Sequence, residues 1–187
     1  MIKIISGKYK GNNLASLSTK VVRPTQARIK KSLLEILGPY DGKSVLDLFS
    51  GIGTIGIEML SRGAKSLTCV EKDRRVFKTL LENLKNICYV DEVEVFCSDY
   101  KKYLNKQKMK KFDIIFADPP YESDYFHKLT ALIDKPNITT QKALFIYEHF
   151  KKNETPEYFG NFKKLRDKTY GDSRISIFKK GEVASND

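Results

Sequence analysis

The sequence predicts an α/β protein built on a mostly parallel, seven-stranded sheet. Strand-like and helix-like segments alternate from residue 44 to residue 147, which is the order of a parallel sheet with helices on both faces. The last two predicted strands, 163–168 and 173–178, are joined only by Tyr170-Gly171-Asp172. So short a connection requires an antiparallel hairpin. The 187 residues are enough for one domain with a full core.

The N-terminal segment precedes this alternation. Residues 1–22 alternate loosely between apolar and polar side chains, with turn points at Gly7 and Gly11, and predict a small β-hairpin. From Thr25, a plausible N-cap, the apolar spacing becomes helical, and Gly38-Pro39 ends the helix. The expected organisation, in chain order, is an N-terminal β extension (1–24), a main domain (25–179) and a disordered tail (180–187).

Each remaining element has a local signal. The strands are short apolar runs, and the helices carry apolar residues at intervals of three and four. The expected strands cover 44–49, 66–70, 93–96, 112–117 and 143–147. The expected helices cover 54–61, 74–86, 100–107 and 125–133.

The charge of the chain is strongly positive. Lys and Arg number 34 against 23 Asp and Glu, which gives a net charge of +11 and predicts a polyanionic partner. The alternative is a lysine-rich surface that serves only solubility. Before Asp41 the only acid is Glu35, among eight basic residues, and this local excess favours a docking surface.

The composition also limits the class of protein. No apolar run approaches the roughly 18 residues that span a bilayer, and the N-terminus lacks the features of a signal peptide. The three cysteines are odd in number and far apart. These features predict a reduced, cytoplasmic protein with no membrane partner.

A glycine-rich loop directly follows the predicted strand 44–49 and opens a helix. Its sequence, Asp47-Leu48-Phe49-Ser50-Gly51-Ile52-Gly53-Thr54-Ile55-Gly56, matches G-x-G-x-x-G in the correct context. Glu71 follows about 20 residues later at the tip of the next strand, where an acid accepts hydrogen bonds from both ribose hydroxyls. The pattern predicts a cofactor that contains adenosine, unless the glycines serve only a tight turn.

Three features favour S-adenosylmethionine over NAD as this cofactor. Asp47 stands before the glycines, where a carboxylate disfavours a pyrophosphate but can hold an amino-acid group. Asp99 follows the strand 93–96 and can accept from the adenine amine, with Tyr100 beside the ring, although Asp99 could instead cap a helix. The C-terminal antiparallel hairpin is the topology of class I methyltransferases rather than of nicotinamide domains.

A second motif, Asp118-Pro119-Pro120-Tyr121, follows the buried strand 112–117. Two prolines remove two backbone donors and keep the chain extended, so the Asp118 carbonyl is available to a ligand. A carboxylate, a carbonyl and an aromatic face suit a planar ring with an exocyclic amine. The alternative is a strand end stopped by Pro-Pro.

With these motifs in view, the chain resembles the RsmD family of bacterial enzymes. The resemblance includes Arg23-Pro24-Thr25, the glycine loop, Asp118-Pro119-Pro120-Tyr121 and Tyr170-Gly171-Asp172-Ser173. It implies a Rossmann-like class I fold and methyl transfer from S-adenosylmethionine to a guanine N2 of 16S ribosomal RNA. The implied partner is that RNA, within a 30S subunit or an assembly intermediate.

The expected site residues fall into three groups. The expected catalytic residues are Asp118, Pro119, Pro120 and Tyr121. The expected cofactor-binding residues are Thr25, Asp47, Phe49, Ser50, Gly51, Gly53, Glu71, Lys72, Asp99, Tyr100 and Asp118. The expected RNA-binding residues are Lys3, Lys8, Lys10, Arg23, Arg28, Lys30, Lys31 and Arg174. No metal site is expected, and His127 and His149 are interpreted as structural.

Other functions share parts of this pattern. An amino methyltransferase acting on adenine N6 of DNA or RNA, or on a protein glutamine, has the same fold and motif. A nicotinamide oxidoreductase would need a separate substrate-binding domain, and the sequence contains no segment that predicts one. If the chain were a non-catalytic RNA-binding protein of ribosome assembly, its catalytic and cofactor motifs would be expected to be damaged. Gly51, Gly53, Glu71 and Asp118 are all intact.

Overall fold

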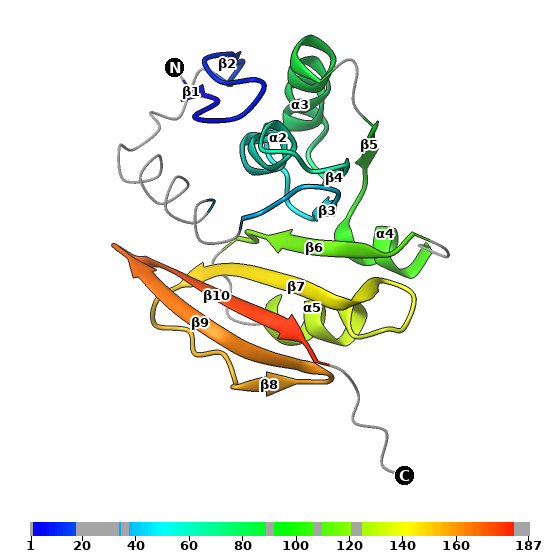
Figure 1. Cartoon of the computed structure of the whole chain (residues 1–187), viewed down its shortest axis with the longest axis vertical. Coiled ribbons are helices and arrows are strands. Elements are labelled where there is room, and N and C mark those ends of the chain that lie inside the picture. Colours follow the sequence, from blue (N-terminus) through cyan, green and yellow to red (C-terminus); the bar gives the residue numbers. More distant parts are fainter. Residues whose placement is uncertain are drawn as a thin grey trace. The chain divides into compact units, whose positions relative to one another are not determined.

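The computed structural model describes residues 2–17, 34, 38–88, 92–106, 110–120 and 125–181. The chain forms two compact units, Met1–Tyr100 and Lys101–Asp187, whose elements are labelled in Figure 1. The helix expected from Thr25 lies outside the described residues except for Leu34, which is helical and buried.

The N-terminal extension is a small hairpin in the first unit. Strand β1 (Ile2–Lys3) pairs antiparallel with β2 (Asn13–Leu14). Gly7 and Gly11 adopt φ angles of 81° and 90°, so both predicted turn points use the left-handed backbone conformation that glycine favours. The structure therefore confirms the hairpin expected from the sequence.

Beyond the hairpin and Leu34, the described residues of the first unit form a parallel sheet with the helices α2 and α3. Its strands stand in the order β5-β4-β3, with bounds β3 (Ser44–Asp47), β4 (Ser66–Glu71) and β5 (Glu92–Cys97). Helix α2 (Thr54–Ser61) is buried along nearly its whole length, whereas α3 (Arg74–Ile87) buries one stripe. The parallel order places the carboxyl ends of β3, β4 and β5 at one edge of this sheet.

The second unit is a mixed sheet in the order β6-β7-β10-β9-β8. Strand β6 (Phe112–Ala117) runs parallel to β7 (Thr139–Phe150). Strand β10 (Ser173–Lys180) lies antiparallel between β7 and β9 (Phe162–Tyr170), and β8 (Tyr158–Phe159) pairs with β9. This arrangement confirms the C-terminal antiparallel hairpin.

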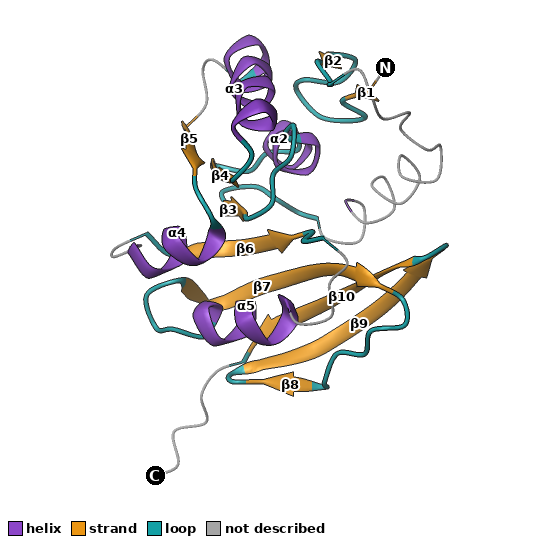
Figure 2. Ribbon diagram, turned by 180° about the vertical axis from the view of Figure 1, so that it is seen from behind, coloured by secondary structure: helices purple, strands orange, loops and turns teal. Residues whose placement is uncertain are grey.

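Two helices complete the described elements, α4 (Tyr100–Lys106) and α5 (Tyr125–Ile133). Figure 2 shows α5 against one face of the sheet of the second unit. The Phe126 ring of α5 lies 5.4 Å from Tyr147 on β7 and 5.5 Å from Phe178 on β10. These aromatic contacts are the core between α5 and the sheet.

The elements differ from the sequence expectations in several bounds, and one additional strand occurs. β3 ends at Asp47 rather than at residue 49, because Leu48 and Phe49 already belong to a turn. β7 starts at Thr139, four residues before the apolar run that predicted it, since its first residues are polar but still pair with β6. β8 is a two-residue edge strand that no sequence pattern indicated. Among the described residues, none of the helices is both long and apolar enough to span a membrane.

Candidate active site

Ser50 fixes the glycine-rich loop to two strands of the first unit. Its hydroxyl donates to the backbone carbonyl of Asp47 (2.8 Å) and accepts from the backbone N–H of Val70 (3.1 Å). Its own N–H donates to the Val70 carbonyl (3.1 Å). Because Ser50 is buried and its hydroxyl both donates and accepts, the loop begins from a fixed position between β3 and β4.

Glu71, at the end of β4, organises the same loop from the other side. Its Oε2 accepts from the backbone N–H of Gly51 (3.0 Å), and its Oε1 accepts from that of Asp73 (2.8 Å). A carboxylate has about four lone-pair positions. Two of them are used here, so the half-buried Glu71 retains acceptor capacity for the two hydroxyls of a ribose.

The two expected loop glycines have different roles. Gly51 has a φ of 54°, and no described atom lies within 4 Å of the place where a Cβ would stand. Gly53 has a φ of 89°, but a Cβ there would stand 2.8 Å from Leu80 and 2.9 Å from Ile57. Gly51 therefore faces open space, as close approach of a ligand requires, whereas Gly53 allows α3 to pack against the start of α2.

Asp47 is enclosed beneath the loop. It is 1% exposed and lies in register with Cys69 of β4. Burial, and then the charge of Asp47, raise the pKa of the Cys69 thiol well above its usual range, so this thiol stays protonated. A Cβ added to Gly56 would stand 3.2 Å from Asp47 Oδ2, so the carboxylate also lies against the first turn of α2.

The remaining cofactor candidates of the first unit lie after β3, β4 and β5. The rings of Phe49 and Tyr100 are 5.2 Å apart at 42°, so residues that follow two different strands form one aromatic pair. Tyr100 is buried, while Asp99 and Lys72 are exposed. Thr25 lies outside the described residues.

The acid-Pro-Pro motif belongs to the second unit. Asp118 follows β6 directly and is exposed, as is Pro120, while Pro119 is buried. Ala117, the residue before Asp118, lies in register with Tyr147 of β7. Asp118 is thus at the surface at the carboxyl end of a buried strand, and Tyr121 lies outside the described residues.

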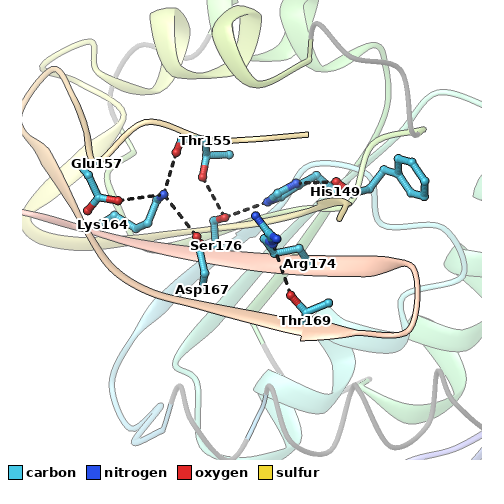
Figure 3. Close-up of polar contacts among 9 residues, drawn as sticks. His149, Thr155, Glu157, Lys164, Asp167, Thr169, Arg174 and Ser176 are labelled. Carbon is cyan, nitrogen blue, oxygen red and sulfur yellow. Dashed lines mark hydrogen bonds and ion pairs between the residues drawn. The ribbon is translucent and has the colours of Figure 1, made fainter. Parts of the chain in front are cut away.

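A directed hydrogen-bond chain runs across the sheet from His149, close to the end of β7 (Figure 3). His149 Nδ1 lies 3.0 Å from the Phe150 carbonyl, which can only accept, so Nδ1 donates and Nε2 accepts from the Ser176 hydroxyl at 2.8 Å. Ser176 Oγ then accepts from Thr155 at 3.1 Å. Burial lowers the pKa of His149, which favours the neutral ring that this chain requires. These contacts fix the ring of His149 against β10.

The expected RNA-binding residues fall in both units. Lys3, Lys8 and Lys10 are exposed on the N-terminal hairpin. Arg174 is half-buried on β10, with its Nε 3.4 Å from Thr169 Oγ1. Arg23, Arg28, Lys30 and Lys31 lie outside the described residues. No group of three or more His, Cys, Asp or Glu side chains that could hold a metal ion occurs in the described part of the chain.

Three buried polar residues that the sequence analysis missed attach the N-terminal hairpin to the helices of the first unit. Glu58 accepts from the N–H groups of Ile5 and Ser6, and the Ser61 hydroxyl donates to the Ser6 carbonyl. Asn83 Nδ2 donates to the Ala15 carbonyl (3.1 Å). The sequence carries a signal for each of these residues, because each is a polar side chain on a helix face that is otherwise apolar and buried.

Asn83 also reaches the glycine-rich loop. Its Nδ2 donates to the Ile52 carbonyl at 2.9 Å, and its Oδ1 accepts from the Ala15 N–H at 2.8 Å. One side chain therefore holds both the glycine-rich loop and the N-terminal extension.

Solved structures define the class of protein. The chain superposes on the Escherichia coli protein yhhF with a TM-score of 0.87 and 28% identity, over 97% of this chain and 99% of that one. The putative methyltransferase SMU.776, solved with S-adenosylhomocysteine, shares the fold at a TM-score of 0.67 and 19% identity, over 84% of this chain and 50% of that one. The fold, with its C-terminal hairpin, is that of the class I S-adenosylmethionine-dependent methyltransferases.

Sequence relatives narrow the class to a family. The family model "Conserved hypothetical protein 95" matches residues 2–179. Ribosomal RNA small subunit methyltransferase D of Haemophilus influenzae is 35% identical over 176 residues, covering 91% of this chain and 89% of the relative. The Escherichia coli K12 protein of the same name is 28% identical over 187 residues, covering 100% and 93%. The chain belongs to this RsmD family of ribosomal RNA methyltransferases, which confirms the resemblance carried by the sequence motifs.

Proposed function

We propose that this protein transfers a methyl group from S-adenosylmethionine to the exocyclic N2 amine of a guanine in 16S ribosomal RNA. The observation that carries the proposal is the exposed Asp118 at the end of β6, followed by Pro119-Pro120, in a chain of the RsmD family. The names of the relatives support methylation of small-subunit ribosomal RNA. The choice of guanine N2 rests on the resemblance and on the chemistry of a carboxylate acceptor.

The residues of the first unit fit S-adenosylmethionine. The open space above Gly51 admits a ligand against the backbone, and Glu71 retains two acceptor positions for ribose hydroxyls. Tyr100 lies beside the exposed Asp99, which can accept from the adenine amine. When bound, the cofactor supplies an electrophilic methyl group on a sulfonium centre.

The proposed role of Asp118 is to hold and orient the amine of the base. Its carboxylate accepts one amine hydrogen and a nearby backbone carbonyl accepts the other, which directs the nitrogen lone pair away from both. A carboxylate is a stronger acceptor than an amide, which suits this task. Holding reacting groups in a near-attack geometry can contribute on the order of 7–11 kcal/mol. The product nitrogen then loses a proton to Asp118 or to water.

The target base must leave its stack before Asp118 can reach its amine. This unstacking costs a few kcal/mol. Stacking on one aromatic side chain returns about 1–3 kcal/mol per base, and the sequence assigns that role to Tyr121. Lys3, Lys8 and Lys10 on the hairpin, together with Arg174, are the described candidates for contacts to phosphates.

The decisive experiment is methyl transfer from labelled S-adenosylmethionine to 30S particles that lack the modification, followed by mapping of the labelled base. We expect a single guanine N2 to be labelled. Label on an adenine N6, or on protein alone, would refute the proposed target.

An Asp118→Ala variant tests the site itself. We expect it to bind S-adenosylmethionine like the wild type, as measured by calorimetry, and to lose methyl transfer. Equal turnover in the variant and the wild type would exclude the proposed role of Asp118.

A further inference from the structure

The second unit contains a basic groove far from the acid-Pro-Pro motif along the sheet. It has a volume of about 460 Å³ and is lined by Lys142, Lys163, Leu165, Lys179, Lys180 and Gly181. We call these residues the lysine groove. It lies near the start of β7 and at the end of β10, and none of its lining residues is acidic.

The lysines of the groove repel one another in the folded protein. Lys163 on β9 stands directly opposite Lys179 on β10. Like charges in such a cross-strand pair are unfavourable. Lys179 is in register with Leu144 of β7, and side chains two residues apart share a face, so Lys142 lies on the same face. Three ammonium groups thus gather where the fold gains nothing from their proximity.

Protection of a sheet edge does not explain this cluster. Lysines on an edge strand prevent strands of other molecules from pairing there, but β8 covers β9 at Lys163, which lies in register with Tyr158. Lys179 lies on β10 between β7 and β9, and Lys142 lies on β7. Neither strand is an edge of the sheet of the second unit.

The neighbouring Lys164 differs from the groove lysines, because its ammonium group is paired within the protein. Its ammonium donates to the Thr155 carbonyl (2.7 Å) and lies 3.3 Å from both Glu157 and Asp167 (Figure 3). In contrast, Lys142, Lys163 and Lys179 are exposed and have no ion pair with any described residue, although the Lys163 ammonium lies 5.7 Å from the centre of the Tyr158 ring. Their charges remain available to a ligand.

The position of the groove suits a long polyanion. Tyr147 lies in register with Ala117, the residue before Asp118. Lys142 precedes Tyr147 on the same strand by roughly 17 Å, at about 3.3 Å per residue. One nucleotide cannot contact both places, whereas an RNA chain can.

We propose that the lysine groove binds the phosphate backbone of the substrate RNA at a distance from the methylated base. The inference rests on the proposed RNA substrate and adds a second contact surface to it. Lys142, Lys163 and Lys179 neutralise phosphates, and each phosphate contact releases counterions from the RNA. Lys180 donates to Thr139 Oγ1 at 2.8 Å and so holds its ammonium at the wall of the groove.

The test compares two triple variants that lose the same number of charges. The groove variant is Lys142→Gln, Lys163→Gln and Lys179→Gln. The control is Lys65→Gln, Lys78→Gln and Lys85→Gln, which removes exposed lysines of the first unit outside the proposed sites. The dissociation constant of a 16S ribosomal RNA transcript is measured for both variants and the wild type between 50 and 200 mM salt, with methylation of 30S particles in parallel.

We expect the groove variant to reduce the slope of log affinity against log salt by about two to three, one phosphate for each lysine. The maximal methylation rate and the affinity for S-adenosylmethionine should equal those of the wild type. A slope equal to that of the control would overturn the inference. The binding measurement does not require turnover, so it tests the lysine groove even if the wild type does not methylate 30S particles. Absence of methylation by the wild type would contradict the proposed function and not the groove.

Discussion

The docking of the N-terminal hairpin depends on Glu58. This residue is 2% exposed and accepts from the N–H groups of Ile5 (2.8 Å) and Ser6 (2.9 Å) and from Arg62 Nε (3.1 Å). In Glu58→Ala all three donors lose their acceptor. Removing one partner of a buried ion pair costs about 3–5 kcal/mol. Because Ile5 and Ser6 are only half-buried, water can replace part of the lost bonding, and we expect about 3 kcal/mol.

Calorimetry and limited proteolysis measure this loss. In a chain of this length 1 kcal/mol lowers the melting temperature by about 2–4 °C, so Glu58→Ala should lower it by about 6–12 °C. Trypsin should also cleave faster after Lys8 and Lys10. The control is Glu82→Ala, which removes an exposed acid from α3. A shift below about 2 °C with an unchanged tryptic pattern would refute the assigned role of Glu58.

Three further predictions concern the loop and the second unit. Asn83→Ala should weaken both S-adenosylmethionine binding and protease resistance of the hairpin, because the side chain bonds Ile52 and Ala15; loss of only one property would contradict a shared anchor. Glu71→Ala should raise the dissociation constant of S-adenosylmethionine at least about tenfold, since charged hydrogen bonds contribute about 1.5–3 kcal/mol; an unchanged constant in calorimetry counts against the ribose contact. Burial lowers the pKa of His149 in the folded state, so as the pH falls below about 6.5 the unfolded chain binds the proton first and stability decreases. His149→Gln should therefore flatten the decline of the unfolding free energy with falling pH, and an identical pH profile would exclude His149 as its source.

The parts of the fold that could be predicted are those with local causes. The glycine loop follows a strand because its conformation depends on residues that are neighbours in sequence, and Gly51 and Gly53 do adopt positive φ angles. The antiparallel pairing of β9 and β10 follows from the length of their connection alone. Polar strand residues carry less of this local information, so the first residues of β7 were missed.

The parts that could not be predicted depend on pairings between distant residues. Glu58 and Asn83 each bond residues more than 50 positions away. Lys163 and Lys164 are adjacent and identical in type, yet the first lies exposed beside Lys179 and the second is enclosed by two carboxylates. Strand alternation explains the difference, but only after the register and the bulge of β9 near Lys164 are known.

Helix α2 connects the glycine-rich loop with the N-terminal hairpin. At its start Gly53 ends the loop that Ser50 and Glu71 hold, and along its body Glu58 and Ser61 hold the hairpin. Its eight residues span only about 12 Å, so the loop and the hairpin are attached to one short element. Asn83 ties the same two segments together from α3. The hairpin is therefore attached close to the loop, so RNA bound by Lys3, Lys8 and Lys10, as we propose, would be held by the same helices that hold the proposed cofactor loop.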